Sequence, residues 1–276
     1  MRIRTFLASL AILFLAVSLP LAAQSAPCLP QARESAFQVG EEMNLSLIYK
    51  WGAVNTEVAS ANMALESTRY KGEEVYHTRL KVRSAAFFDV FFKMREDFQS
   101  WFAMRDLKPR KFIRDTYEGG YTALNQYIYD WKAGVIHADV NFENRGAQSL
   151  DIPLHDCVYD LPALIYYLRN ADFSRMKAGK SYPLSFAIDD AVFNVKLNYK
   201  GVETIKVRRL GKIRARHFSC SVVQGAMFEG DQELQIWVSD DANCLPLAVM
   251  VPLRIGSVWA YLKSYDHIKY PFSARL

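Results

Sequence analysis

Beyond its N-terminal stretch, the sequence lacks any apolar run long enough to cross a membrane. It also lacks a strong charge of one sign: 34 lysines and arginines stand against 29 acids, and the formal net charge is +5. A nucleic-acid partner calls for a dense cationic surface, and so mild an excess argues against one. We therefore expect a soluble mature protein that binds no nucleic acid.

Recognisable catalytic motifs are missing as well. The chain contains no G-x-S-x-G, H-E-x-x-H, G-x-x-x-x-G-K-[ST] or G-x-G-x-x-G segment, which are patterns of hydrolase, zinc-protease, nucleotide and dinucleotide sites. No C-x-x-C pair occurs either, so the cysteines do not predict a zinc site. We expect no metal, no cofactor and no enzymatic activity, and keep a hydrolase with an unrecognised acidic site as an alternative.

The N-terminal stretch has the pattern of an export signal. Two arginines precede an apolar run over residues 6–19, which ends at Pro20 and is followed by small residues. A basic start, a short apolar run and a small-residue exit are typical of a cleaved secretory signal. The sequence thus predicts a periplasmic protein with three parts: a signal peptide (1–23), an N-terminal linker (24–36) and a single β-rich domain (37–276).

The four cysteines carry the next prediction. An even number of cysteines in an exported chain fits two disulfides, and four cysteines allow three pairings. Proximity in sequence favours Cys220 with Cys244, which leaves Cys28 with Cys157. Lipidation of Cys28 would instead anchor the chain to a membrane, but Pro27 stands where a small residue normally precedes a lipidated cysteine.

Polar and apolar residues alternate through most of the mature chain, for example in "MNLSLIYKWG" and "VIHADVNFE". Turn segments such as "YKGEE", "EGGYT" and "KAGV" separate these runs. Alternation at period two, broken every 8–14 residues by a turn, is typical of a meandering antiparallel sheet. The sequence predicts a mainly β fold, either a large curved antiparallel sheet or an open β-barrel.

One segment departs from this alternation. Apolar residues between Val158 and Leu168 recur at helical spacing. Asp160 suits the N-cap, Pro162 suits the first turn, and Arg169 complements the dipole near the C-terminus. We predict one inserted helix over about residues 160–170.

The adjacent acids Asp240 and Asp241 lie in "SDDAN", between two apolar runs. Short polar side chains of this kind bond to local backbone and favour a turn. We interpret the pair as a strand–strand turn, in which replacement of either acid by asparagine is tolerated. The alternative is a ligand, metal or hydrolase site that also includes Asp97.

Aromatic residues are abundant, with 17 phenylalanines, 15 tyrosines and 5 tryptophans. The segment "AAFFDVFFKM" fits either a short helical turn between strands or a buried strand. Its rings could fill the core, or they could line an apolar groove on a curved sheet. On the second interpretation the candidate ligand-binding residues are Phe87, Phe88, Phe91, Phe92 and Trp101.

The order of four segments suggests a family. The succession "FQVGEEMNLSLIYKWG", "REDFQSWFAMRDLKPRKF", "DLPALIYYLR" and "IWVSDDANCLPLAV" resembles the domain of unknown function 3108 family, over about residues 37–265. This resemblance implies an exported bacterial β-rich protein. A looser similarity to open, helix-plugged barrels of periplasmic lipoprotein carriers implies an apolar ligand groove and no catalytic residues.

These observations predict a non-enzymatic cell-envelope protein that binds or carries an apolar, lipid-like ligand. The first alternative is a structural or assembly partner of another envelope protein. The second is the hydrolase with the acidic site.

Overall fold

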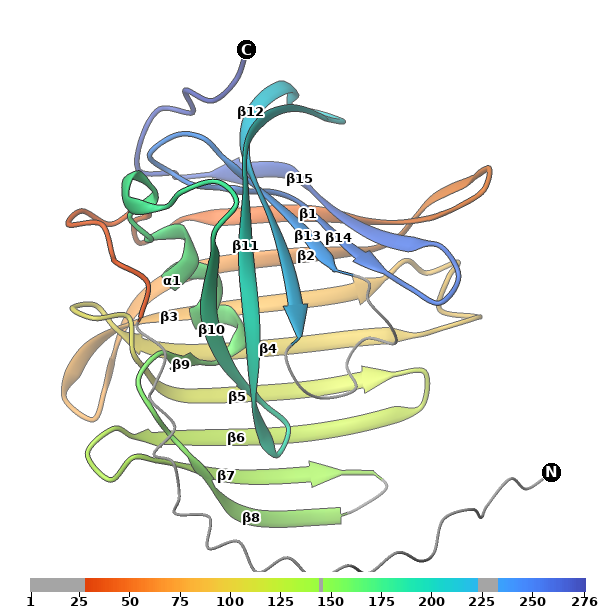
Figure 1. Cartoon of the computed structure of the whole chain (residues 1–276). Helices are drawn as coiled ribbons and strands as arrows, with labels where there is room; N and C mark the ends of the chain where they lie inside the picture. The colour runs from red at the N-terminus through yellow and green to blue at the C-terminus, as the bar shows by residue number, and fades with distance from the viewer. Residues whose placement is uncertain (1–27, 144–145, 223–232) are drawn as a thin grey trace, which may run out of the picture.

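The computed structural model describes residues 28–143, 146–222 and 233–276. Within them the chain forms one sheet of 15 strands (Figure 1). The strands are β1 (Glu42–Trp51), β2 (Val54–Tyr70), β3 (Glu73–Ser84), β4 (Met94–Ala103), β5 (Pro109–Glu118), β6 (Tyr121–Asp130), β7 (Val135–Phe142), β8 (Gly146–Pro153), β9 (Val158–Tyr159), β10 (Ser181–Ile188), β11 (Ala191–Val207), β12 (Gly211–Val222), β13 (Leu234–Ser239), β14 (Pro246–Pro252) and β15 (Ser257–Asp266).

The strand order shows how the two halves of the chain meet. From edge to edge it is β8-β7-β6-β5-β4-β3-β2-β1-β15-β14-β13-β12-β11-β10-β9. Neighbours are antiparallel except β9 and β10, and the pairing of β1 with β15 joins the N-terminal meander to the C-terminal one. The edge strands β8 and β9 do not pair with each other, so the sheet stays open. The predicted curved antiparallel sheet is confirmed.

Local sequence explains the strands. In β7, Ile136, Ala138, Val140 and Phe142 are buried, and the residues between them are exposed. Successive side chains of a strand point to opposite faces, so this alternation gives one face to the core and one to solvent.

The helix α1 (Leu161–Arg169) is the predicted insertion, and a short 3-10 helix η1 (Phe173–Arg175) follows it. The Asp160 carboxylate accepts a hydrogen bond from the Ala163 backbone N–H at 3.0 Å, and Pro162 lies in the first turn. This is the N-cap arrangement that the sequence predicts.

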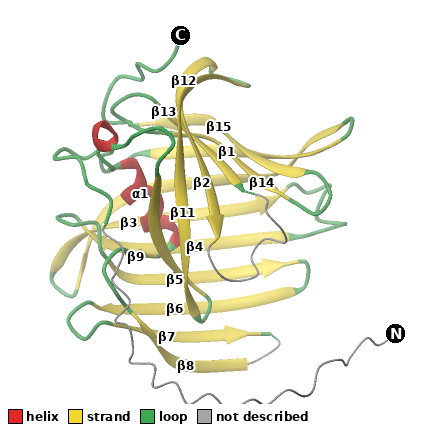
Figure 2. Cartoon of the chain, viewed as in Figure 1, coloured by secondary structure: helices red, strands yellow, loops and turns green. Residues whose placement is uncertain are grey.

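The helix lies inside the curve of the sheet. It packs against β3, β4 and β10, and β10 and β11 cross over the strands of the N-terminal half (Figures 1 and 2). Aromatic rings fill the space: the Tyr166 ring lies 4.7 Å from Phe37 and 5.6 Å from Phe102, between centroids. Such rings bury a large apolar area, and one buried cluster joins the helix to strands of both halves of the sheet, for example through Met63 and Leu197. A second buried cluster lies under β4–β8 and includes Phe112 and Ile136.

The predicted signal peptide, residues 1–23, lies outside the described residues, as does the linker up to residue 27. Among the described helices, none is long and apolar enough to span a bilayer.

Candidate functional site

The acidic pair Asp240–Asp241 forms a turn between β13 and β14. Asp241 is buried, and its carboxylate accepts hydrogen bonds from the Ser239 hydroxyl at 2.7 Å and the Asn243 backbone N–H at 3.1 Å. It also accepts one from the backbone N–H of Ala274, at 3.3 Å, so it holds the C-terminal segment against this turn. These contacts make Asp241 a structural residue.

The other two acids of the alternative site are held by arginines. Asp240 accepts from Arg214 and Arg216, each at 2.6 Å, and Asp97 pairs with Arg79 in a two-point contact on β3 and β4. In the described part of the chain, no group of three or more histidines, cysteines or acids is placed to hold a metal ion. The acids therefore act as partners of neighbouring arginines.

The cysteines form one of the two expected disulfides. Cys28 and Cys157 are bonded, with 5.5 Å between their Cα atoms, whereas Cys220 and Cys244 are free thiols. The expected Cys220–Cys244 bond is wrong, because the two residues lie at opposite ends of β13. Cys220 pairs with Leu234 at its start, and Cys244 follows its end. β13 has six residues, so its first and last Cα atoms lie roughly 17 Å apart. Burial also raises the pKa of the Cys220 thiol to about 11, so it is not a reactive thiolate.

The candidate phenylalanines lie in residues 85–93, the connection between β3 and β4, here called the phenylalanine loop. It consists of tight turns: the N–H of Phe88 donates to the Ala85 carbonyl at 2.8 Å, and that of Phe91 to the Phe88 carbonyl at 2.9 Å. The turn interpretation is thus correct, and the buried-strand interpretation is wrong. Val90 and Phe91 are 84% and 82% exposed, and Phe87 and Phe92 are exposed as well. Apart from the half-buried Phe88, these rings do not fill the core.

An ion pair fastens the loop to the sheet. Arg95 Nη1 donates to Asp89 Oδ1 at 3.0 Å, and the Ser84 hydroxyl also donates to this carboxylate. These hydrogen bonds from Arg95 and Ser84 lower the pKa of Asp89 to about 2. Gly119 of the next hairpin allows the Phe92 ring to approach, because a Cβ there would lie 2.6 Å from the ring. The loop is therefore held in place while its apolar side chains face outward.

Beside the phenylalanine loop lies a hollow of about 350 Å³ between β3, β4 and β5, here called the cationic hollow. Its cations are Lys81, Arg83, Lys93 and Arg95, and its acids are Glu96, Asp97 and Asp115. Arg95 pairs with Asp89, and Asp97 pairs with Arg79. Among the described residues, no ion pair involves the remaining three cations.

The register of β3 and β4 places Arg83 directly opposite Arg95. Like charges opposite each other destabilise a sheet, and Asp89 compensates the charge of Arg95 but not that of Arg83. Arg83 is therefore the cation of this pair that is open to an anion from outside the chain. This surface was not predicted from the sequence, although a signal for it is present there. Arg79, Lys81 and Arg83 alternate along β3, and residues at period two share one face.

Trp101 is not part of this site. It lies near the other end of β4, roughly 23 Å along the strand from Met94. Its ring stacks on His77 with 4.4 Å between centroids, and the Lys111 ammonium lies 5.1 Å from its centre. The structure brings the four candidate phenylalanines into one loop and leaves Trp101 apart from them.

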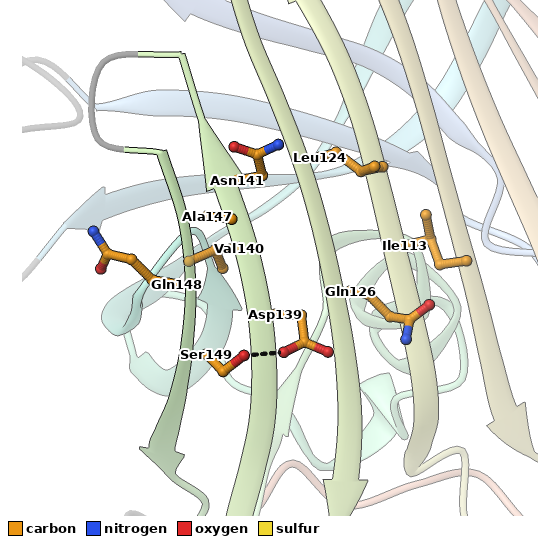
Figure 3. A pocket seen from close by; sticks show the side chains of 9 residues that line it. All are labelled: Ile113, Leu124, Gln126, Asp139, Val140, Asn141, Ala147, Gln148 and Ser149. Carbon is orange, nitrogen blue, oxygen red and sulfur yellow. Dashed lines mark hydrogen bonds between the residues drawn. The ribbon is translucent and has the colours of Figure 1, made fainter.

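A second hollow, of about 510 Å³, lies along β5–β8 (Figure 3). Ile113 and Leu124 supply apolar surface, the amide of Gln126 lies beside them, and Ser149 donates to Asp139 at 2.6 Å. This hollow has no cation among its lining residues, so it lacks the charge that distinguishes the cationic hollow.

The described residues define a β-barrel-like protein: one open, curved antiparallel sheet that holds a helix in its interior. One solved structure agrees with that class. A β-barrel-like protein of the domain of unknown function DUF1849 from Brucella abortus is similar to this chain with a TM-score of 0.54 and 10% identity, over 84% of this chain and 99% of its own. At that identity the likeness shows the fold alone.

The family is shown by the sequence. The family described as "Protein of unknown function (DUF3108)" matches residues 46–263, and the chain belongs to it. The resemblance found in the four ordered segments is thereby confirmed. A candidate lipoprotein from Parabacteroides distasonis is also similar, with a TM-score of 0.30 and 5% identity over 87% of this chain and 100% of its own, which is too distant to support an argument. No curated protein matches the sequence.

Proposed function

We propose that the chain is an exported, non-enzymatic binding protein of the cell envelope, and that it binds an anionic, lipid-like amphiphile. The observation that carries the proposal is the contiguity of the phenylalanine loop and the cationic hollow. Lys93 belongs to both, and Arg95 of the hollow pairs with Asp89 of the loop. An amphiphile with an acidic head group matches this arrangement, because its head group can lie in the cationic hollow while its apolar chain covers the phenylalanine loop.

The expected binding energies fit a ligand that has an apolar chain and an acidic head group. Covering one exposed phenylalanine ring contributes about 2 kcal/mol, so a chain lying over Phe87 and Phe91 gains several. The head group would accept hydrogen bonds from Lys81, Arg83 and Lys93. Charge-assisted hydrogen bonds of this type are stronger than neutral ones.

Export is supported by two observations. Residues 1–23 have the signal-peptide pattern, and the Cys28–Cys157 disulfide suits an oxidising compartment such as the periplasm. The anionic amphiphiles of the envelope would be within reach of the protein there.

The test is calorimetric titration of the mature protein with lysophosphatidylglycerol below its micelle concentration. We expect saturable binding that weakens in the Phe91→Ser variant and in the Lys81→Gln/Arg83→Gln double variant. Lysophosphatidylcholine, which has the same chain and no net charge, is the matched ligand. Lys132 is an exposed cation in the turn between β6 and β7, away from the proposed site. Lys132→Gln is therefore the matched control variant and should bind the lysolipid as the wild type does. Absence of binding, or equal binding by all variants, would overturn the proposal.

A second candidate is an assembly partner of another envelope protein, which the edge strand β8 favours. Most of its side chains are exposed, and the strand ends the sheet. An edge strand presents free N–H and C=O groups to which another chain can add a strand. A photo-crosslinker at Gln148, compared with one at Lys132, tests this candidate: a partner should be captured from β8 and not from the turn.

A further inference from the structure

Three connections lie along one end of the sheet. They are residues 51–54 between β1 and β2, residues 253–256 between β14 and β15, and the phenylalanine loop between β3 and β4, all on the right-hand side of Figure 1. Direct contacts join them to their neighbours. The Tyr49 hydroxyl donates to the Ile255 carbonyl at 3.0 Å, and the Ala85 N–H donates to the Val58 carbonyl of β2 at 2.8 Å.

This end collects the exposed apolar side chains. Of the thirteen large apolar side chains that are exposed in the described residues, eight belong to these connections. They are Trp51, Val54, Phe87, Val90, Phe91, Phe92, Leu253 and Ile255. We call this set the hairpin-tip edge. Exposed apolar residues scattered singly need no explanation, but a concentration on three neighbouring tips marks an interaction surface.

The charges around the hairpin-tip edge are predominantly positive. Arg83, Lys93 and Arg254 are exposed next to the tips, and the Lys50 ammonium lies over the Trp259 ring at 4.2 Å. Two of the nearby acids are already paired: Asp89 with Arg95, and Glu57 with Lys263 at 3.8 Å. A third acid, Glu118, lies opposite Met94 at the end of the phenylalanine loop, so the cations still outnumber the acids here.

We propose that the hairpin-tip edge docks on the surface of an anionic phospholipid bilayer. The apolar tips enter the interfacial region, and the cations set back from them meet lipid phosphates. Interfacial membrane binding uses this combination of tryptophan and phenylalanine with flanking lysine and arginine. Separate tips suit a deformable lipid surface, whereas a protein partner would need a continuous complementary face.

Docking goes beyond the binding of a single amphiphile, and it shares the phenylalanine loop and Arg83 with that site. Its test therefore uses the other two connections. A Trp51→Ser/Ile255→Ser double variant removes two side chains that are 58% and 56% exposed. Leu124→Ser is the matched control, since Leu124 is 53% exposed on β6, away from the tips. Arg254→Gln tests the charge without changing the apolar surface.

The measurement is co-sedimentation of the mature protein with sucrose-loaded vesicles of phosphatidylcholine, with and without one quarter phosphatidylglycerol. We expect wild type and Leu124→Ser to bind the anionic vesicles, with weaker binding at high salt and to the neutral vesicles. The double variant should bind at least about tenfold more weakly, and Arg254→Gln should bind more weakly with less dependence on salt. The circular dichroism melts of all three variants should match the melt of the wild type.

The proposal is overturned if the wild type does not sediment with anionic vesicles, or if the double variant and Leu124→Ser behave alike. Titration with lysophosphatidylglycerol separates the two proposals. If the double variant no longer binds vesicles but still binds the lysolipid, docking is a property distinct from ligand binding. A wild type that binds vesicles but no lysolipid removes the proposed ligand site and leaves docking in place.

Discussion

Glu41 and Arg169 form an ion pair in the interior of the protein, where their side chains are 0% and 2% exposed. Arg169 Nη2 donates to Glu41 Oε2 at 2.8 Å and to the Asn243 carbonyl at 3.0 Å. One guanidinium thus joins the end of α1 to the residue before β1 and to the turn between β13 and β14. Elements far apart in the sequence meet at this side chain.

Breaking this pair should be costly. Arg169→Met leaves the Glu41 carboxylate buried without its ion-pair partner. Glu41→Gln leaves the buried guanidinium without a counter-charge, although the Asn243 carbonyl still accepts from it. We expect either change to lower the free energy of unfolding by about 3–5 kcal/mol. The Glu41→Leu/Arg169→Met double variant should lose less than the sum of the single variants. Urea unfolding followed by circular dichroism measures all of them, and single losses below about 1 kcal/mol would contradict this account.

The free thiols can be counted. Denatured, non-reduced protein should contain two reactive thiols per chain, from Cys220 and Cys244. Titration with a thiol reagent gives the number directly, and zero or four thiols would each rule out the observed pairing. Cys157→Ser should destabilise the fold by about 3–5 kcal/mol, because the bond closes a loop across a sequence separation of 129 residues. Cys220→Ser is the control and should change stability far less.

Two buried acids should make stability depend on pH. Burial raises the pKa of Asp160 to about 7 and that of Glu96 to about 8. In the unfolded chain both titrate near pH 4, so between about pH 4 and 8 the folded state binds more protons. Their contribution to stability is complete below that window and is lost as the pH rises through it.

Chemical unfolding at about pH 5 and about pH 8 measures this effect. Asp160→Asn keeps an N-cap side chain, and Glu96→Gln keeps an acceptor for the Thr116 hydroxyl. Each variant should lose less stability than the wild type between the two pH values. An unchanged difference in both variants would show that other groups cause the dependence.

The two acids of the β13–β14 turn should respond differently, which revises the sequence-based expectation that both tolerate asparagine. In Asp241→Asn, an amide nitrogen replaces one of two oxygens that both accept hydrogen bonds, so we expect a loss of about 1–3 kcal/mol. Asp240→Asn weakens a partly exposed ion pair and should lose about 0–1 kcal/mol. Thermal melts with and without divalent metal are the check. A metal-dependent increase in the wild-type melting temperature that either variant loses would support a metal site instead.

Much of the fold could be read from local sequence. The alternation in β7 and the caps of α1 depend on neighbours within a few residues, so both were predicted correctly. The Cys220–Cys244 pairing failed because nearness in sequence says little about which end of β13 each residue occupies. The phenylalanine loop was ambiguous for a similar reason: its apolar residues match the composition of a buried strand, and only the surrounding structure decides whether anything covers them.

The sequence by itself determined the strand alternation, the capped helix and the family. These follow from side-chain periodicity, from caps that act within one turn, and from the order of short segments. The tertiary structure alone decided that β1 pairs with β15, that Arg169 reaches Glu41, and that three distant connections gather at one end of the sheet. The contact between Glu41 and Arg169, for example, spans 128 positions of the chain. The closure entropy of such contacts is offset only when the whole core forms around them.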